Sequence, residues 1–233
     1  MANLALVQQA GQFTAGATST LTFPAPVTVG NLLVLWAAGF AAGPPTIGGN
    51  ITVAGWTAIG SHPMAGPTGM VIYQYAGIVT GAGTTLSATL ATAPYTYIGA
   101  AEFSGAPAST VADGTPSDST AASGQPTTSF TSVNPSDLVV AGSLIQGGSD
   151  NGPPASGWGV VNVASQMVGL YQVANAAGSF TPQWASTTNT GWVATSGAVR
   201  IPVQTTYKPG YPVSALIEEP SEGMEQSNVV PQP

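Results

Sequence analysis

The sequence contains no cysteine, a single histidine and only two basic residues in a chain of 233. Without cysteine it can form neither a disulfide framework nor a thiol nucleophile, and one histidine does not make a zinc site. Two basic residues cannot neutralise a phosphate backbone, and they give little attraction to anionic lipid. We therefore expect no nucleic-acid partner and no membrane partner.

Charge and long hydrophobic runs are also scarce. Charged residues make up 5% of the chain, against about 25% in an average soluble domain, and the formal net charge is −7. The longest apolar run, residues 32–42, is interrupted by Gly39 and is too short to span a membrane. Residues 1–20 contain no basic residue and do not resemble a secretory signal, so we expect synthesis and folding in a cytoplasm. The hydrophobic share of 43% is still high enough for a folded core.

Short strand-like runs, rich in β-branched and aromatic residues, recur along the chain between Gly, Pro, Asn and Ser. The run 32–36 is apolar at every position, which is typical of a central strand buried on both faces. The frequent glycines and the absence of a helical apolar period argue against helices. We expect an all-β fold, a two-sheet antiparallel sandwich of jelly-roll type. The predicted strands are 4–8, 18–23, 31–40, 57–59, 70–78, 84–90, 95–103, 127–133, 137–145, 158–163, 166–173, 178–184 and 192–201.

Residues 1–201 are expected to form this sandwich, and their two halves, about 1–105 and 126–201, show a faint internal similarity. The similarity indicates an internal duplication, or else a chance alignment of strands and turns with biased composition. The halves could each form a domain or could interleave their strands in one sandwich, and we expect the single sandwich. The Ser- and Thr-rich segment 105–125 is expected to be a long surface loop. The aligned segments are 27–35 with 133–141, 72–74 with 170–172, and 97–103 with 193–199.

Residues 202–233 differ in composition from the rest, with 6 of the 20 prolines and 4 of the 9 acidic residues. The prolines favour an extended, polyproline-like backbone. A disordered tail is one interpretation. The other is an arm that lies on a neighbouring subunit, anchored by apolar side chains between the prolines. The candidate partner-binding residues of this arm are Tyr207, Tyr211, Leu216, Ile217, Glu218 and Glu219.

Few residues could carry catalysis. His62 is the only general base near neutral pH, and no Gly-x-Ser-x-Gly sequence marks a nucleophile. Asp113, Asp137 and Asp150 stand in turn-like contexts, so Glu102, within a predicted strand, is the unusual acid, and one carboxylate cannot act as both acid and base in glycoside hydrolysis. We expect no enzymatic activity, no cofactor and no metal site. Asp113, Asp118, Asp150 and Asn151 could offer oxygen ligands to calcium, but they lack a regular spacing.

The five tryptophans fall into three groups. Trp36 and Trp192 lie within predicted strands and are expected in the core. Trp56 and Trp158 each follow a glycine at matching places in the two halves, which indicates a shared packing role. Trp184 is the candidate for an exposed ring that stacks against a glycan.

Three segments of the first half carry a resemblance at the level of the fold. They are 27–35, where a buried strand is entered through Gly-Asn, 73–77 and 101–105. With residues 136–141 and Trp192 of the second half, they resemble β-sandwich proteins of tailed-phage virions and bacterial surfaces, over roughly residues 20–202. The resemblance implies a jelly-roll-like fold and a structural or adhesive role, and it transfers no catalytic residue.

We therefore expect a structural virion protein, in particular a capsid decoration (cement) protein that binds the outside of the shell and stabilises it. The expected partners are the major capsid protein or neighbouring virion subunits, and the protein is expected to form a homo-oligomer in the virion. Low charge and short side chains suit such contacts, because little side-chain entropy is lost in making them. Two alternatives stay open: a phage fibre or adhesin, or a secreted module, that binds host glycans through exposed aromatic side chains.

Overall fold

The structure is a computed structural model in which the chain divides into two units, Ala2–Val203 and a smaller unit of Met1 and Gln204–Pro233. All described residues belong to the larger unit. His62 and the arm candidates between Tyr207 and Glu219 lie outside the described residues, so the predictions made for them stay predictions. The described residues are 4–40, 43–60, 69–105, 109–147, 156–164, 166–185 and 190–201.

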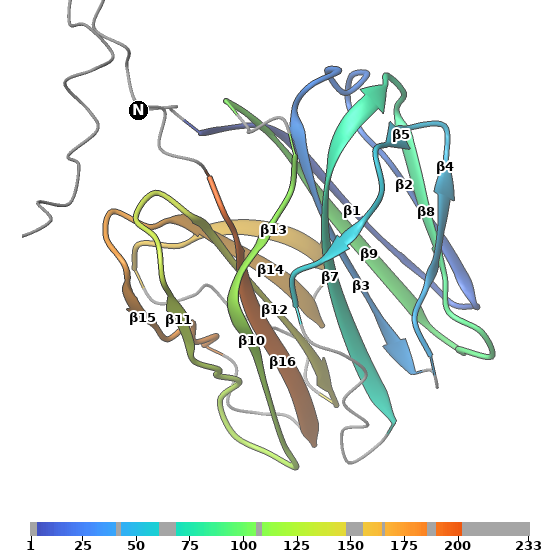
Figure 1. Ribbon diagram of the computed structural model, residues 1–233. Helices are drawn as coiled ribbons and strands as arrows, with labels where there is room; N and C mark the ends of the chain where they lie inside the picture. Colours follow the sequence, from blue (N-terminus) through green and yellow to red (C-terminus); the bar gives the residue numbers. More distant parts are fainter. Residues whose placement is uncertain are drawn as a thin grey trace, which may run out of the picture. The chain divides into compact units, whose positions relative to one another are not determined.

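Every regular element in the described part of the chain is a β-strand (Figure 1), which confirms the all-β expectation. Each predicted strand segment contains a strand, whereas β4, β5 and β10 lie outside the predicted segments. The strands are β1 (Ala5–Thr14), β2 (Thr18–Thr22), β3 (Leu32–Phe40), β4 (Thr46–Gly49), β5 (Thr52–Val53), β6 (Thr57–Ala58), β7 (Met70–Gly81), β8 (Thr85–Thr89), β9 (Thr96–Ser104), β10 (Ala112–Ala121), β11 (Phe130–Ser132), β12 (Leu138–Gln146), β13 (Gly159–Ala164), β14 (Met167–Val173), β15 (Gly178–Phe180) and β16 (Gly191–Val199).

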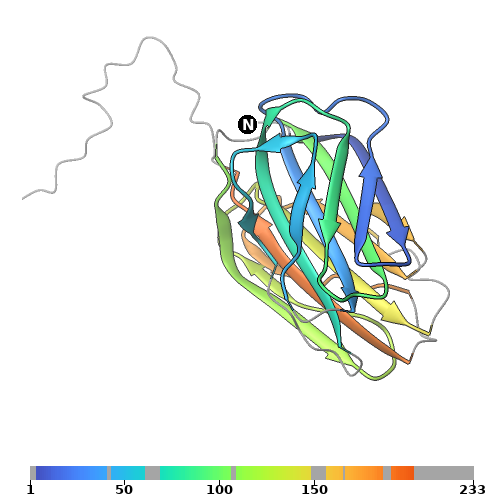
Figure 2. The same cartoon turned by 90° about the vertical axis from the view of Figure 1, so that its right-hand side faces the viewer.

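The strands form two large and two small antiparallel sheets (Figures 1 and 2). The first large sheet has the order β1-β9-β3-β7-β5, with β6 also paired to β7. The second has the order β10-β16-β12-β14-β13. The small sheets are β2-β8-β4 and β11-β15. Each sheet takes its strands from one half of the chain, so the expected interleaving of the halves is wrong.

The two large sheets repeat the same strand order. At one edge of each sheet, the first strand pairs with the last one, β1 with β9 and β10 with β16. Their registers also match, because Leu32 pairs with Phe103 and Leu138 pairs with Val199, as the aligned segments require. The aligned segments 72–74 and 170–172 do not occupy matching register positions. The duplication itself stays a prediction, now with a shared topology beside the sequence similarity.

The large sheets pack against each other face to face through one apolar cluster with side chains from β3, β7 and β9 and from β12, β14 and β16. Trp36 of β3 is fully buried in this cluster, and its Nε1 donates a hydrogen bond to the carbonyl oxygen of Ala141, 3.0 Å away, in the opposite sheet. Gly142 and Gly169 leave room for the indole, since a Cβ on either would come within 3.0 Å of it. The core position expected for Trp36 is confirmed.

The small sheets cover the outer faces of the large ones. In the first half, Leu21 of β2 and Leu86 of β8 pack against Leu33 and Leu35, on the face of β3 opposite Trp36. In the second half, Phe130 and Phe180 of the β11-β15 sheet pack against the outer face of β12 and β16. Because β3 faces a core on both sides, all its residues up to Gly39 are buried, which confirms the expected central strand.

The segment 105–125, expected to be a surface loop, instead contains the ten-residue strand β10 paired with β16. Its sequence has few β-formers, so it is pairing with β16 that holds it extended. The register shifts between Asp113 and Ser117, which lifts Gly114, Thr115 and Pro116 out of the ladder. Proline is tolerated in such a bulge because no backbone N–H is needed there.

Candidate functional site

A buried carboxylate ties together three segments at one end of the first large sheet. Glu102 of β9 is fully buried, and it faces Gln8 of β1 in the ladder. Its oxygens accept hydrogen bonds from Gln8 Nε2 at 2.6 Å, from the Thr28 backbone N–H at 2.8 Å and from Asn31 Nδ2 at 2.6 Å. Three hydrogen-bond donors compensate for the desolvation of this buried carboxyl group, which forms no ion pair with a described residue. This cluster fixes the turn that leads into β3.

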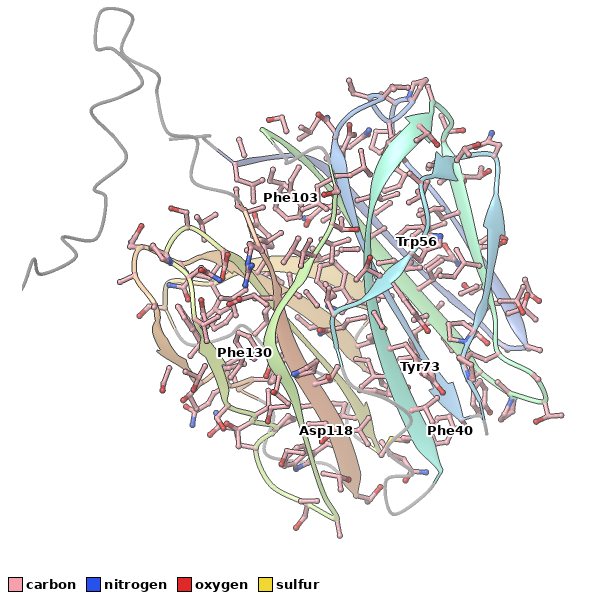
Figure 3. All side chains as sticks on the ribbon, in the orientation of Figure 1. Phe40, Trp56, Tyr73, Phe103, Asp118 and Phe130 are labelled. Atoms are coloured by element: carbon pink, nitrogen blue, oxygen red, sulfur yellow. The ribbon has the colours of Figure 1, made fainter. Side chains whose placement is uncertain are left out.

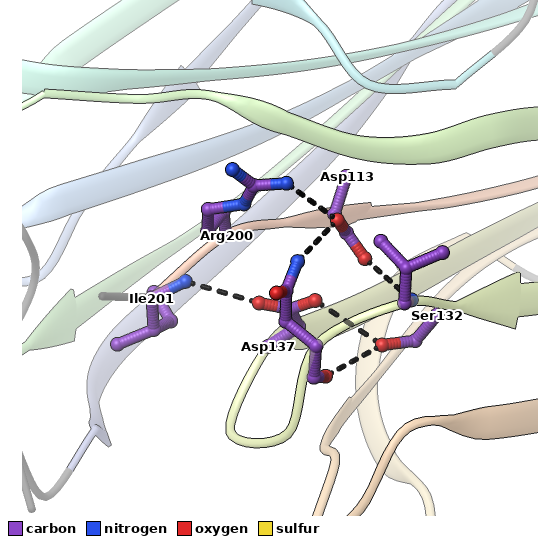
Figure 4. Close-up of polar contacts among 7 residues, drawn as sticks. Asp113, Ser132, Asp137, Arg200 and Ile201 are labelled. Carbon is purple, nitrogen blue, oxygen red and sulfur yellow. Dashed lines mark hydrogen bonds and ion pairs between the residues drawn. The ribbon is translucent and has the colours of Figure 1, made fainter. Parts of the chain in front are cut away.

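A second buried cluster, drawn in Figure 4, is centred on Asp113 at the start of β10. Asp113 Oδ2 accepts a hydrogen bond from the Val133 backbone N–H at 2.8 Å. Its Oδ1 accepts one from Asn134 Nδ2 at 2.7 Å and forms an ion pair with Arg200 Nη2 at 3.2 Å. The carboxylate thus joins β10 to the turn before β12 and to the residue that follows β16.

Asp137, in the same cluster, is fully buried just before β12 (Figure 4). It accepts hydrogen bonds from Ser132 Oγ at 3.1 Å and from the Ile201 backbone N–H at 3.2 Å. Burial and the adjoining carboxyl group of Asp113 raise the pKa of Asp137 to about 7. Burial alone also raises the pKa of Asp113, but its hydrogen bonds, including those from Asp137 and Val133, lower it overall. Asp137 is therefore the carboxyl group that holds a proton near neutrality.

The two buried clusters occupy the same place in the two halves. Gln8 faces Glu102 across β1 and β9, and at the matching register position Asp113 faces Ala198 across β10 and β16. The residue before β3 is an asparagine, and the residue before β12 is Asp137. The first half thus places its carboxyl group on its last strand, β9, whereas the second half places one on its first strand, β10, and one just before its middle strand, β12. In both clusters, the hydrogen bonds and the ion pair run between the protein's own strands and turns, which indicates a structural role.

Six large aliphatic side chains are exposed around these clusters, and together they are called the aliphatic end. The exposed fraction is largest for Val29, at 57%, and Val133, at 58%. Phe103 and Tyr171, whose rings lie 5.1 Å apart, join the two sheets at this end, and Figure 3 shows Phe103 there. The last described residue, Ile201, belongs to the same core cluster as Phe103. The aliphatic end consists of Leu6, Val7, Val29, Val111, Val133 and Val173.

Two shallow surface hollows lie along the bulged strand β10 and share Ser117 and Ser129. Asp118 is the one ionisable side chain that lines them. Backbone and hydroxyl groups could bind a polar ligand here, but a single carboxylate gives no acid–base pair. The first hollow is lined by Gly114, Thr115, Pro116, Ser117, Ser129, Phe130, Thr131 and Val133, the second by Ser117, Asp118, Ser119, Thr127, Thr128, Ser129 and Thr181.

Only two aromatic side chains in the described part of the chain are classed as exposed, and they contact each other. Phe13 is 38% exposed and Tyr95 is 45% exposed, and their ring centroids are 6.0 Å apart with 27° between the planes. Tyr97 and Phe40 contact this pair from inside, at 4.8 Å from Phe13 and 6.2 Å from Tyr95. We call Phe13 and Tyr95 the aromatic pair. Nothing in the sequence indicated it, because the two rings meet only when β1 pairs with β9.

The expectation of an exposed Trp184 is wrong. Its side chain is fully buried and packs in one cluster with Trp192 on the outer face of the second large sheet. Trp192 is itself 4% exposed, which confirms its core position. Trp56 and Trp158 are half-buried and pack against the outer-face clusters of their own halves, in agreement with a shared packing role. Although the neighbouring Gln183 is exposed, the Trp184 side chain points into the cluster on the outer face of the sheet.

The acids considered as calcium ligands do not come together among the described residues. Asp113 is held in the cluster of Asp137 and Arg200, while Asp118 is exposed on β10. Asp150 and Asn151 lie outside the described residues. Within the described ranges, no group of three or more His, Asp and Glu side chains is placed to hold a metal ion.

Comparison of the chain with protein-family models, curated proteins and solved structures gives no match. In the described part of the chain, no helix is long and apolar enough to cross a membrane. The function has to be argued from the surface of the protein itself.

Proposed function

We propose that the chain is a structural protein of a tailed-phage virion, a decoration protein with a jelly-roll-like β-sandwich that attaches to the outside of the capsid and stabilises it. The observation that carries the proposal is the distribution of exposed apolar side chains. Among the described residues, eight large hydrophobic side chains are exposed, and six of them form the aliphatic end. An apolar group gathered at one end of the strands favours a contact surface over scattered exposure.

The buried clusters support this proposal because they hold the aliphatic end in place. The Val133 backbone N–H donates to Asp113, and the Arg200 N–H donates to the carbonyl oxygen of Val111. Thr28, next to Val29, donates to Glu102. These hydrogen bonds fix the backbone, and the β-branched valine side chains on it have few rotamers, so little conformational entropy is lost when a partner covers them.

The described part of the chain ends at Ile201, which packs in the same core cluster as Phe103. We propose that residues 202–233 form an arm that contacts the same partner as the aliphatic end. The partner we propose is the major capsid protein or a neighbouring virion subunit, the latter including another copy of this chain. Two linked contacts would raise the affinity above that of either alone.

The test is binding of the purified protein to particles that lack it, with mass spectrometry of purified virions giving its copy number relative to the major capsid protein. We expect deletion of residues 203–233, and separately the replacement of Val7, Val29 and Val133 by serine, to reduce binding while the body keeps its β-sheet circular dichroism. The matched control replaces Phe13 and Tyr95, at the other end of the strands, by alanine. If both test variants bind particles as tightly as the wild type, the proposed attachment surface is wrong.

The glycan-binding alternatives lose their sequence candidate, because Trp184 is buried. An enzymatic role has no support from the buried carboxyl groups, since Glu102, Asp113 and Asp137 are at most 1% exposed.

A further inference from the structure

The aromatic pair lies at the end of the first large sheet opposite the aliphatic end. Leu6 pairs with Phe103 near the start of β1, and Phe13 pairs with Tyr97 near its other end. Seven residues of extended strand separate Leu6 from Phe13, or roughly 23 Å at about 3.3 Å per residue. Phe40 contacts Tyr95, and Figure 3 shows Phe40 and Phe103 at opposite ends of the sheet. A particle held by the aliphatic end would leave the aromatic pair uncovered.

Both residues of the pair adjoin buried residues, Phe13 through its ring and Tyr95 through the turn before it. Phe13 packs on Tyr97, which is 2% exposed and donates a hydrogen bond from its hydroxyl group to Gln166 Oε1. Tyr95 follows a turn in which the Ala93 N–H donates to the Leu90 carbonyl at 3.1 Å, with both residues buried. The pair is therefore preformed, and binding would cost little ordering of side chains.

The turn before Tyr95 is also strained. Thr92 has a φ of 62°, in the left-handed region, which a β-branched residue seldom adopts. Such strain persists only where the surrounding structure imposes it, and it is concentrated at binding and switch sites. Thr92 precedes Tyr95 by three positions, so its backbone conformation contributes to the orientation of the Tyr95 ring at the surface.

The exposed area of the pair fits a small ligand and not a protein partner. If a whole aromatic side chain presents roughly 200 Å², exposures of 38% and 45% leave about 170 Å² of ring surface. A stable protein–protein contact needs about 800 Å² from each partner. An area of this size corresponds to the face of one or two small rings.

No charged side chain of the described residues lies near the pair. Glu102, Asp113, Asp137 and Arg200 belong to the clusters at the other end of the strands, and Asp118 lies in the other large sheet. The described groups around the pair therefore favour a neutral ligand over a phosphate, a carboxylate or a cation. The tyrosine hydroxyl of Tyr95 supplies a neutral donor and acceptor at the rim.

We propose that Phe13 and Tyr95 form a carbohydrate-binding site that stacks against the C–H face of one neutral pyranose unit of a glycan. The aliphatic C–H groups of such a sugar carry partial positive charge and contact the negative face of an aromatic ring. Its hydroxyl groups, directed away from that face, can bond to the Tyr95 hydroxyl group and to water. The proposal does not depend on the capsid attachment of the other end.

The test uses the full chain and three neutral probes, maltohexaose, cellohexaose and hexa-N-acetylchitohexaose, at millimolar concentrations. Saturation-transfer NMR detects contact, and calorimetric titration gives the Kd. We expect at least one probe to bind and expect Phe13→Ala and Tyr95→Ala each to weaken it by roughly 2- to 10-fold. Tyr95→Phe, which keeps the ring, should retain most of the affinity, and Val133→Ala at the aliphatic end should leave the Kd unchanged.

Thermal unfolding and β-sheet circular dichroism of each variant separate loss of the site from loss of the fold. Each alanine variant of the pair should keep a cooperative transition at a lower Tm, because more than half of each side chain is buried. The proposal is overturned if no neutral probe binds, or if the Phe13→Ala, Tyr95→Ala double variant binds as the wild type does. A third outcome also overturns it. If the wild type binds no glycan and the double variant loses self-association or particle binding, the pair is a protein contact. Retained particle binding with lost glycan binding supports it and leaves the attachment proposal intact.

Discussion

A left-handed backbone residue precedes the middle strand in both halves of the protein. In the first half this residue is Gly30, with a φ of 91°, and in the second it is Ser136, with a φ of 71°. The Ser136 N–H donates to the Ala174 carbonyl at 2.7 Å, which fixes the turn and places Asp137 in its cluster. Glycine adopts such a φ without steric cost, whereas an L-residue with a side chain is strained by about 1–2 kcal/mol.

We predict that Ser136→Gly raises the free energy of unfolding by about 0.5–1 kcal/mol, because relief of strain exceeds the greater chain entropy of glycine in the unfolded state. Urea denaturation measures the change. The reciprocal variant Gly30→Ser should lower stability by about 1 kcal/mol, since the space around Gly30 is open and only the backbone is strained. Ser129→Gly, at an exposed position without positive φ, is the control and should not stabilise. A destabilised Ser136→Gly variant would mean that the serine side chain matters more than its φ.

At the scale of single strands, β3 depends on one large side chain that reaches across the layer between the sheets. We predict that Trp36→Ala lowers the free energy of unfolding by about 3–5 kcal/mol, because the indole is fully buried and bonded to Ala141. Chemical denaturation gives the difference. The control, Trp56→Ala, removes a half-buried indole at the edge of another cluster and should cost clearly less. Equal losses for the two variants would show that the central layer does not depend on Trp36.

The Asp113–Asp137 cluster joins three elements, β10, β12 and the end of β16, and makes their connection depend on pH. Burial raises the pKa of Asp137 from its ordinary value of 3.8 to about 7 in the folded protein. Between these two values the folded state keeps a proton that the unfolded state has lost, so stability falls as pH rises through this window. Below it, protonation of Asp113, whose pKa is lowered, reduces stability again.

We predict that Asp137→Asn flattens the fall in stability between about pH 4.5 and 7.5, because an amide mimics the protonated acid at every pH. Unfolding free energies measured across this range give the slope for each protein. The control is Asp118→Asn, which removes an exposed carboxylate of β10 and should leave the slope as in the wild type. If Asp137→Asn and the wild type have identical slopes, Asp137 is not the group that keeps a proton in the folded state.

The sequence predicts most strands of this fold, but it misses two features that depend on distant contacts. Alternating and β-branched runs bounded by turns locate the long strands of the first half and β12, β14 and β16. Strand β10 reads as a loop, since Asp113-Gly114 and Pro116 are turn residues and only the ladder with β16 keeps them extended. The buried clusters are missed for the same reason, because strand pairing brings together residues that are far apart in the sequence.

Two further features of the site escape prediction for a related reason. Asp113 and Asp137 both stand in sequences typical of turns, and nothing local indicates that their carboxyl groups share one buried cluster. Trp184, the candidate for an exposed ring, is buried because it packs with Leu170 and Trp192 on the outer face of the second large sheet, whereas no sequence pattern pointed to the exposed Phe13. Exposure of a single ring is decided by the layers around it, which short sequence windows do not encode.

At the scale of the whole chain, charge is absent from most of the described surface. Glu102, Asp113 and Asp137 are buried, which leaves Asp118 and Arg200 as the exposed ionisable Asp, Glu, Lys or Arg side chains of the described residues. An attachment made through the aliphatic end therefore rests on apolar contact and backbone hydrogen bonds. Apolar burial does not weaken when salt shortens the Debye length from about 10 Å at 0.1 M to about 3 Å at 1 M.

We predict that particle binding by the full chain survives 1 M NaCl with at most a modest loss, measured as the bound fraction after sedimentation of particles. The four glutamates of residues 202–233 could meet a basic groove of the partner and supply that salt-sensitive part. Replacing Glu218, Glu219, Glu222 and Glu225 together by glutamine should abolish the salt dependence and leave the remaining affinity in place, because only the ionic contribution is removed. Complete release of the wild-type protein at 1 M NaCl would contradict an apolar attachment and would require a strongly basic partner surface instead.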